Sequence, residues 1–489
     1  MPRPRRGREG GMIRQSRAEN NESARAAGDG IPADGGLPVS RRPRPCRSPA
    51  PSLIIAAAMD LLCPCGRDTI RLRLPDDTDV YASAYPEPKA PADAIVLGAV
   101  REPVSGPGLR DALARRGPGD VVIVVSDITR PIPYAAFLPQ LLAEIESAAV
   151  PRGDILLLVA AGMHRPSTPA ERVEMFGPDA ATRYRIEDHQ AGNDAGLVEL
   201  PGRSASGARI RLNRRFVEAG FRLVTGLVEP HFMAGFSGGR KAVLPGLAAL
   251  DAIRNFHGAA FLSDPRARNG NLDGNPLHAE ALSVARRAGV DFSLNIVLDG
   301  ARRVTAAFAG GLEPAHDAAC AFVRRCACRP VRREADVVVT SCGGYPLDAT
   351  FYQCVKGLVA CLPAVRPGGT IVAFGGCAEG VGSPAYADLM KRYTGRWREF
   401  LDDIRQPGVF TMDQWEFQMQ TRALERVGEA RLHFVTDGLR AETLATLSLT
   451  GHAVPPGGVG PAVQALLDRL LAGGAAAAAL PEGPYGVPV

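Results

Sequence analysis

The chain has 489 residues, enough for two or three domains that each bury a core. Hydrophobic residues make up 46% and charged residues 22%, a globular composition that excludes a disulfide-stapled miniprotein and a disordered chain. No apolar run approaches the roughly 20 residues of a membrane-spanning helix, so no membrane role is expected. Residues 1–58 contain 11 arginines and five acidic residues, which accounts for the net charge of +5 and gives no argument for nucleic-acid binding.

The N-terminal segment differs from the rest of the chain. Residues 1–58 are rich in Arg, Pro, Gly and Ala without an amphipathic period, so we expect a disordered basic tail. A mitochondrial-type transit peptide is the alternative, although the acidic residues argue against it. Residues 69–74 alternate apolar and polar side chains, which predicts a strand and raises the hypothesis that Met59 is the native start.

The ten cysteines are too sparse for a disulfide framework, which favours a cytoplasmic protein. Several lie in apolar or Gly-rich stretches, where free thiols pack as small hydrophobic side chains. Two pairs have C-x-C spacing instead of the C-x-x-C spacing of tetrahedral metal sites, so we assign them no metal.

Short runs dense in Val, Ile and Leu recur along the chain, each followed by a helix-like stretch. Continuous apolar strands separated by helices predict parallel sheets covered on both faces, and hence an α/β fold. An Arg-rich stretch at 324–333 separates two halves, so we expect α/β domains over 59–300 and 301–489 with an active site in the cleft between them. The Ala-rich stretch 473–480 is expected to join a final helix to a short terminal strand or tail. The clearest expected strands are 121–125, 155–160, 223–227, 337–340, 370–374 and 432–435.

Polar residues follow directly after three of these strands. Asp127 and Arg130 follow the first strand, His164 the second and His231 the third. Ligands of open parallel sheets gather at the carboxyl ends of the strands. The positions therefore predict a functional cluster at one sheet edge.

A glycine-rich segment, residues 234–241 (AGFSGGRK), is the sharpest local signal. Its glycines allow a ligand to approach the backbone, and with Arg240 and Lys241 it is interpreted as a phosphate cradle, a tight structural turn being the alternative. The spacing matches neither a Walker A loop nor G-x-G-x-x-G. A desolvated Lys241 is also suited to a covalent bond with a cofactor carbonyl.

In the second half, Gln353 and Lys356 are three residues apart and would share one helix face. An amide and a cation together suit a carboxylate. An exposed helix face is the alternative.

Together these motifs resemble the nickel-pincer lactate racemase family, over about residues 59–489. Members of that family have two α/β domains with the active site between them. They hold nickel in pyridinium-3,5-bisthiocarboxylic acid mononucleotide, the nickel-pincer nucleotide. The matching segments are 126–133 (SDITRPIP), 161–166 (AGMHRP), 226–246 (GLVEPHFMAGFSGGRKAVLPG), His257 and 352–357 (YQCVKG).

The resemblance implies a role for each matched residue. Lys241 would form the covalent link to the cofactor, and His257 would be the protein ligand of nickel. His164 and His231 would be the catalytic acid/base pair. The remaining expected contacts are Asp127, Ile128, Thr129 and Arg130 for the cofactor, and Arg130, Gln353 and Lys356 for the substrate.

The implied reaction is racemisation or epimerisation of a 2-hydroxy acid, with lactate as the default substrate. The hydrogen at C2 is a weak acid, so its transfer as hydride to an electron-poor ring is the natural cofactor solution. One His would take the hydroxyl proton as hydride leaves, and the other would supply the proton after the planar keto acid reorients. Proteins that make the cofactor are implied partners.

Two other functions stay open at this point. A non-catalytic carrier of the pincer nucleotide would need Lys241 and His257 but not the two catalytic histidines. A zinc enzyme using His231 and His257 would not need Lys241. The histidines outside the matched positions, His278, His316, His433 and His452, are expected to be dispensable for chemistry.

Overall fold

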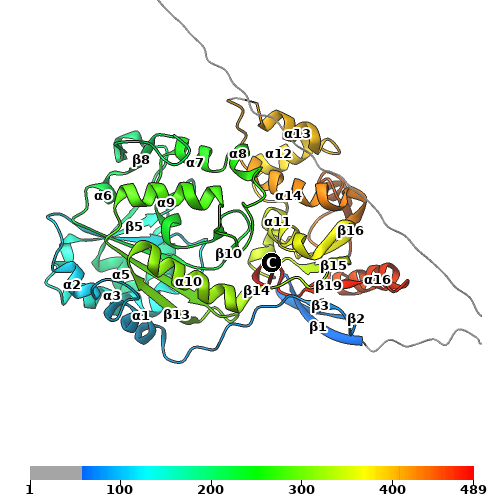
Figure 1. Ribbon diagram of the computed structural model, residues 1–489, viewed down its shortest axis with the longest axis horizontal. Coiled ribbons are helices and arrows are strands. Elements are labelled where there is room, and N and C mark those ends of the chain that lie inside the picture. The colour runs from blue at the N-terminus through cyan, green and yellow to red at the C-terminus, as the bar shows by residue number, and fades with distance from the viewer. Residues whose placement is uncertain (1–57, 407) are drawn as a thin grey trace, which may run out of the picture. The chain divides into compact units, whose positions relative to one another are not determined.

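The computed structural model describes residues 58–406 and 408–489, so the expectations for the basic tail lie outside the described residues. Two six-stranded sheets organise the described chain (Figure 1). The first sheet contains β4 (Val121–Ser126), β5 (Ile155–Ala160), β6 (Arg185–Asp188), β9 (Phe221–Leu227), β12 (Phe292–Leu298) and β13 (Val304–Gly310). The second contains β3 (Asp79–Val80), β15 (Ala335–Ser341), β16 (Val365–Phe374), β17 (Leu432–Thr436), β18 (Thr450–Ala453) and β19 (Ala477–Leu480).

Shorter ribbons and the helices complete the described chain. The two-stranded ribbons use β1 (Ala58–Cys65) with β2 (Asp68–Pro75), β7 (Leu197–Leu200) with β8 (Ile210–Asn213), β10 (Pro230–His231) with β11 (Gly235–Phe236), and β14 (Cys328–Arg329) with β20 (Val487–Pro488). The helices up to residue 327 are α1 (Ala92–Arg101), α2 (Leu109–Leu113), α3 (Leu138–Glu146), α4 (Pro169–Phe176), α5 (Pro178–Arg183), α6 (Arg214–Val217), α7 (Leu250–Phe256), α8 (Ala259–Leu262), α9 (Pro276–Ala288) and α10 (Leu312–Ala327). The later helices are α11 (Phe351–Ala360), α12 (Pro384–Arg392), α13 (Trp397–Ile404), α14 (Gln414–Val427), α15 (Ala441–Leu444) and α16 (Val459–Leu471).

The first sheet has the strand order β13-β12-β9-β4-β5-β6 and is parallel except for the pair β12 and β13. Every residue from Val121 to Val125 in β4 is buried. Val121, Ile123 and Val125 pack with α1 to α5, whereas the two valines between them face the core that includes α7 and α9. Burial on both faces is the reason that β4 is continuously apolar.

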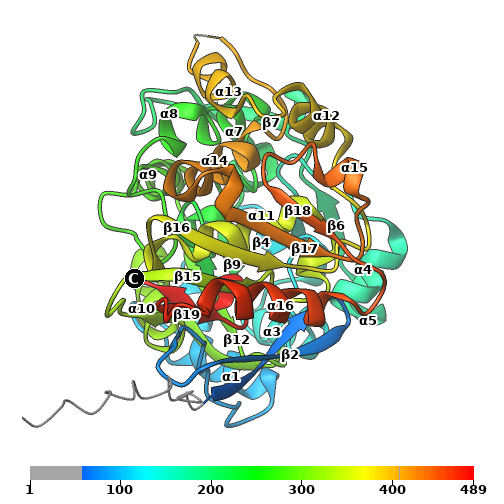
Figure 2. The same cartoon turned by 90° about the vertical axis from the view of Figure 1, so that its right-hand side faces the viewer.

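The second sheet has the order β18-β17-β16-β15-β19-β3, and all its neighbours are parallel. The β1–β2 hairpin and α16 cover one face, as Figure 2 shows. Helices α11 to α14 pack against the other face, in a core that continues to the helices of the first sheet. No helix within 58–406 or 408–489 is long and apolar enough to cross a bilayer.

The predicted α/β class is confirmed, and all six expected strands are present. Sheet membership does not follow the expected division at residue 300. Strand β13 lies after residue 300 yet belongs to the first sheet, while β3 and the β1–β2 hairpin join the second. The Ala-rich stretch was expected to lead into a terminal strand or tail, but it supplies β19, an inner strand between β15 and β3.

Candidate functional site

Asp127 and His164 form a pair at the carboxyl ends of β4 and β5. His164 Nδ1 lies 2.5 Å from Asp127 Oδ2, and Thr129 Oγ1 donates to Asp127 Oδ1 at 2.7 Å. Burial opposes ionisation of Asp127, but the hydrogen bonds from His164 and Thr129, together with the charge of Arg130, bring its pKa below the ordinary value. The carboxylate holds the proton on Nδ1, so His164 presents the lone pair of Nε2.

His231 is held differently, in the β10–β11 hairpin that follows β9. Its Nδ1 accepts from the backbone N–H groups of Met233 and Ala234, both at 3.2 Å. Because Nδ1 accepts, the proton of the neutral ring is on Nε2, which lies 3.2 Å from Lys241 Nζ. Burial, followed by the positive charges around the ring, among them those of Lys356, Arg130 and Arg240, lowers the pKa of His231 well below the ordinary value, so the ring is neutral.

Lys241 lies in the 3₁₀ turn η4 (Gly239–Ala242), half-buried, with its Nζ 5.7 Å from the centre of the Phe256 ring. Burial and the positive charges of Arg130, Arg240 and Lys356 lower its pKa well below the ordinary lysine value. An amine without its proton is the nucleophilic form of lysine.

His257 directly follows α7 and is its C-cap residue. Its Nδ1 lies 3.0 Å from the carbonyl of Ile253 and donates to it, so the lone pair of Nε2 is free. Burial above all lowers its pKa to about 4, which keeps the ring neutral. A neutral imidazole oriented through its other nitrogen is the usual form of a metal-binding histidine.

These groups fit a covalently held metal cofactor. In the described ranges, no group of three or more His, Cys, Asp or Glu side chains could hold a metal ion. His257 therefore offers one protein ligand, which suits a metal whose other ligands come from an organic group. Lys241 offers the reactive amine for that group.

Gln353 and Lys356 come from α11, beside the second sheet, and both are half-buried. Lys356 Nζ lies 5.9 Å from the ring of Phe232, the residue after His231. Burial and the charge of Arg130 lower the pKa of Lys356, while Glu416 and Glu229 raise it. The structure thus brings Lys356 to the hairpin that carries His231.

The glycine-rich segment forms a tight turn in which two amides and Arg240 already have partners within the protein. Its amides at Ser237 and Gly239 donate to the carbonyl of Glu229 and to Asn295 Oδ1, both at 3.0 Å. Arg240 is 1% exposed and points into the core. A Cβ on Gly239 would lie 2.7 Å from the ring of His316, so glycine permits this close packing.

Sequence reasoning missed Glu416 in α14. This carboxyl is 1% exposed, and its Oε1 has no partner among the described residues. Burial raises its pKa to about 8 against the opposing charge of Lys356. The preceding Trp415 donates to the hydroxyl of Tyr352 at 2.8 Å and its ring lies 5.0 Å from that of His257. No local sequence signal marks Glu416, because α14 also carries Arg422, Glu425 and Arg426.

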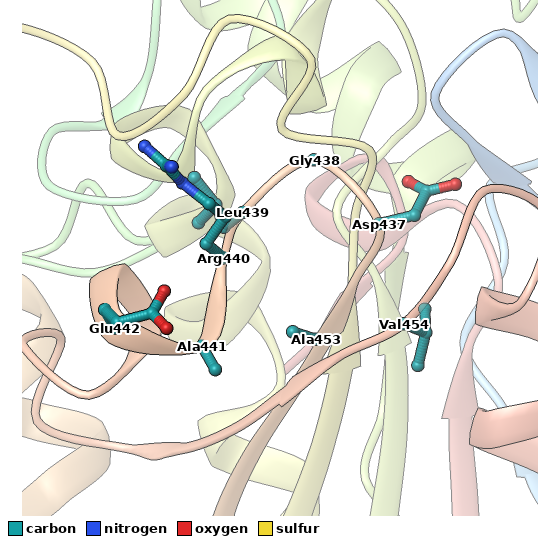
Figure 3. A pocket seen from close by; sticks show the side chains of 8 residues that line it. All are labelled: Asp437, Gly438, Leu439, Arg440, Ala441, Glu442, Ala453 and Val454. Atoms are coloured by element: carbon teal, nitrogen blue, oxygen red, sulfur yellow. The ribbon is translucent and has the colours of Figure 1, made fainter.

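A hollow of about 410 Å³ at the carboxyl end of β17 lies apart from these residues (Figure 3). None of the site residues described above lines it, and we assign it no role. Its lining residues are Asp437, Gly438, Leu439, Arg440, Ala441, Glu442, Ala453 and Val454.

Comparison with known proteins shows the same relatives in sequence and in structure. The lactate racemase N-terminal domain family matches residues 65–270, and the lactate racemase C-terminal domain family matches residues 331–454. The lactate racemase of Thermoanaerobacterium thermosaccharolyticum is 35% identical over 402 residues, 79% of this chain and 90% of that protein. The lactate racemase of Lactiplantibacillus plantarum is 38% identical over 311 residues, 63% of this chain and 72% of that protein.

Solved structures agree. The lactate racemase apoprotein from Thermoanaerobacterium thermosaccharolyticum matches with a TM-score of 0.78 at 32% identity, covering 88% of this chain and 100% of that chain. A Thermotoga maritima protein shares the fold, with a TM-score of 0.58 at 18% identity, covering 81% of this chain and 99% of that chain. On the sequence matches, the chain belongs to the lactate racemase family.

Proposed function

We propose that this protein is a cytoplasmic, nickel-dependent racemase or epimerase of a 2-hydroxy acid, with lactate as the default substrate. The observation that carries the proposal is the pair of imidazoles, His164 and His231, at the carboxyl edge of one sheet. One ring presents a lone pair at Nε2 and the other presents an N–H. The family membership of the chain supports the same reaction class.

The two histidines would move the hydroxyl proton. His164 Nε2 takes the proton from the substrate hydroxyl, and Asp127 stabilises the imidazolium that forms. His231 would supply the proton to the oxygen on the opposite face from its imidazolium form, and would return to the neutral ring that the free protein holds. When bound, the nickel-pincer nucleotide would accept the hydrogen of C2 as hydride and return it.

Other side chains would bind the substrate and the cofactor. Arg130 and Lys356 would hold the substrate carboxylate through charge-assisted hydrogen bonds, with the amide of Gln353 beside them. Lys241 would carry the covalent link to the cofactor, and His257 would bind nickel through Nε2. Asp127, Ile128 and Thr129 would complete the cofactor contacts, and proteins that make the cofactor would be partners.

The test begins with protein made in cells that synthesise the nickel-pincer nucleotide. Single enantiomers of 2-hydroxy acids, lactate included, are incubated with it and followed by chiral chromatography. We expect the opposite enantiomer to appear from one acid. No inversion of any acid by nickel-loaded protein would contradict the proposal and favour the carrier function.

Variants then assign the roles. His164→Ala and His231→Ala are expected to abolish turnover and retain nickel, whereas His257→Ala is expected to lose nickel. His433→Ala, in the second sheet, is the matched control and is expected to change neither. Turnover retained in both His164→Ala and His231→Ala would exclude the acid/base roles.

A further inference from the structure

Arg240 is a buried cation without a carboxylate partner in the described part of the chain. Its side chain is 1% exposed and is found in no ion pair there. Instead, Nη2 donates to the carbonyls of Ala234 at 2.9 Å and Phe236 at 3.1 Å, and Nη1 lies 2.7 Å from His316 Nε2. A buried charge is costly, so hydrogen bonds of good geometry are needed to keep it there.

His316, on α10, is the third partner of this guanidinium and is 3% exposed. Nε2 of His316 also lies 3.0 Å from the carbonyl oxygen of Ser237 and 3.3 Å from Cys320 Sγ, which is 3.7 Å from Nδ1. A guanidinium only donates, so Nε2 accepts from Arg240 when the ring proton is on Nδ1. Burial and the charge of Arg240 lower the pKa of His316 well below the ordinary value, which agrees with a neutral acceptor. The ring reaches Arg240 because Gly239 has no Cβ.

The hydrogen bonds of Arg240 lead directly to the site. The Ala234 carbonyl accepts from Arg240, while the Ala234 N–H donates to His231 Nδ1. That amide, with the one of Met233, decides which nitrogen of His231 carries the proton. The resulting Nε2–H faces Lys241 Nζ at 3.2 Å, and it can be donated only to an amine that has a free lone pair.

The positive charges around Lys241 also favour its unprotonated amine. Burial lowers the pKa of Arg240 to about 10, so its charge persists at neutral pH. After burial itself, the charges of Arg130, Arg240 and Lys356 lower the pKa of Lys241. The charged or titratable groups that act on the Lys241 amine are these three cations, His231 and His257.

We propose that Arg240 and His316 are positioning residues that hold the hairpin backbone at Ala234, whose amide faces His231, so that His231 presents an N–H to Lys241 and keeps its amine unprotonated. This inference rests on the proposed function, in which Lys241 bonds to the cofactor. It gives His316 a part in cofactor loading, although the sequence placed His316 among the dispensable histidines.

The state of Lys241 can be measured in the apoprotein. The chain has only four lysines, and Lys89 and Lys391 are exposed references. Acetic anhydride is reacted with the apoprotein over a pH series, and acetylation of each lysine is quantified by mass spectrometry. In the wild type we expect Lys241 to become reactive at a lower pH than Lys89 and Lys391.

Four variants separate the effect of the Arg240–His316 hydrogen bond from the effect of the Arg240 charge. Arg240→Gln removes both, whereas His316→Leu keeps the charge of Arg240 and removes its acceptor. Both are expected to raise the pH midpoint of Lys241 acetylation by about one unit or more. His316→Gln restores an acceptor oxygen, so its pH midpoint of Lys241 acetylation is expected to lie close to that of the wild type. His278→Gln, at the ring stacked 6.5 Å from His316, is the matched control and should change nothing.

A second measurement reads the proton position itself. The chain has eight histidines, so ¹⁵N-histidine labelling gives a simple NMR spectrum, and His231→Asn identifies the His231 signals. We expect His231 to carry its proton on Nε2 in the wild type and to lose this preference in His316→Leu. Circular dichroism checks that each variant is folded. Should Arg240→Gln fail to fold, the two His316 variants decide the question.

Two results would overturn the inference: an acetylation midpoint of Lys241 unchanged in folded His316→Leu, or a wild-type His231 protonated on Nδ1. Both measurements use the apoprotein and no substrate. Failure to find racemisation would therefore contradict the proposed function alone, while the acetylation and NMR results would still stand.

Discussion

The surroundings of His164 and His231 differ although both rings lie at the edge of the same sheet. The side chain of His164 is 52% exposed and its Nδ1 faces the carboxylate of Asp127. His231 is half-buried, and its Nδ1 faces the amides of Met233 and Ala234. A carboxylate and a pair of amides place the ring proton on opposite nitrogens. The comparison teaches that the same residue type becomes a base or a donor according to what its second nitrogen touches.

The largest effect is expected where the negative charge beside His164 is removed. Asp127→Asn keeps the shape but loses the charge that stabilises the protonated ring, so we expect kcat to fall by about 10²–10⁴-fold. Steady-state racemisation of nickel-loaded protein measures this. Asp179→Asn, in an exposed ion pair with Arg183, is the control and should leave kcat unchanged. A change of less than about twofold in Asp127→Asn would remove the distinction between the two rings.

A second prediction uses the difference in exposure. In His164→Ala, added imidazole can enter from solvent and hydrogen-bond to Asp127, and we expect it to restore activity by about tenfold. In His231→Ala the same imidazole must enter a more buried place among cations, so no recovery is expected. Racemisation rates over an imidazole series measure both. Equal recovery in the two variants would contradict the comparison.

A smaller effect is expected at the substrate carboxylate. Glu416 raises the pKa of the half-buried Lys356, so Glu416→Gln should let Lys356 lose its proton at a lower pH. We expect KM to rise several-fold at alkaline pH with little change in kcat, as seen in pH profiles of both constants. Glu425→Gln, exposed on the same helix, is the control. A KM that is the same as in the wild type at every pH would show that Glu416 does not keep Lys356 protonated.

The smallest effect concerns acid stability, where His257 shares the buried setting of His231. The pKa of His257 is lowered to about 4 from 6.5, so between these values the unfolded chain binds the proton more tightly. The free energy of unfolding should therefore rise with pH across this window, and His257→Asn should flatten the rise. Urea unfolding of the apoprotein at several pH values measures the slope. An unchanged slope would mean that His257 is not neutral in the fold.

Much of the fold could be predicted because the decisive signals are local. Strands such as β4 and β5 are buried on both faces, which leaves a continuous apolar run in the sequence. The Ala-rich strand β19 lacks β-branched residues, so nothing local distinguishes it from a linker. The place of β3 depends on pairing with β19, a contact between distant parts of the chain.

The site residues likewise divide into those that local sequence predicts and those that depend on distant contacts. Asp127, His164 and His231 could be proposed because each directly follows a strand, where sheet topology brings residues together. The direction of the Arg240 side chain could not, since it depends on His316 from α10. Glu416 carries no motif, and its importance comes only from burial near Lys356.

The pairing of β3 with β19 has a consequence for the order in which the protein is made. Residues 79–80 leave the ribosome early, but their partner strand at 477–480 is translated about 400 residues later. The first sheet, within 121–310, can assemble during synthesis, whereas the edge at β3 waits for the last strand of its sheet. Nascent chains stalled before residue 477 are therefore expected to hold a finished first sheet and an unclosed second one.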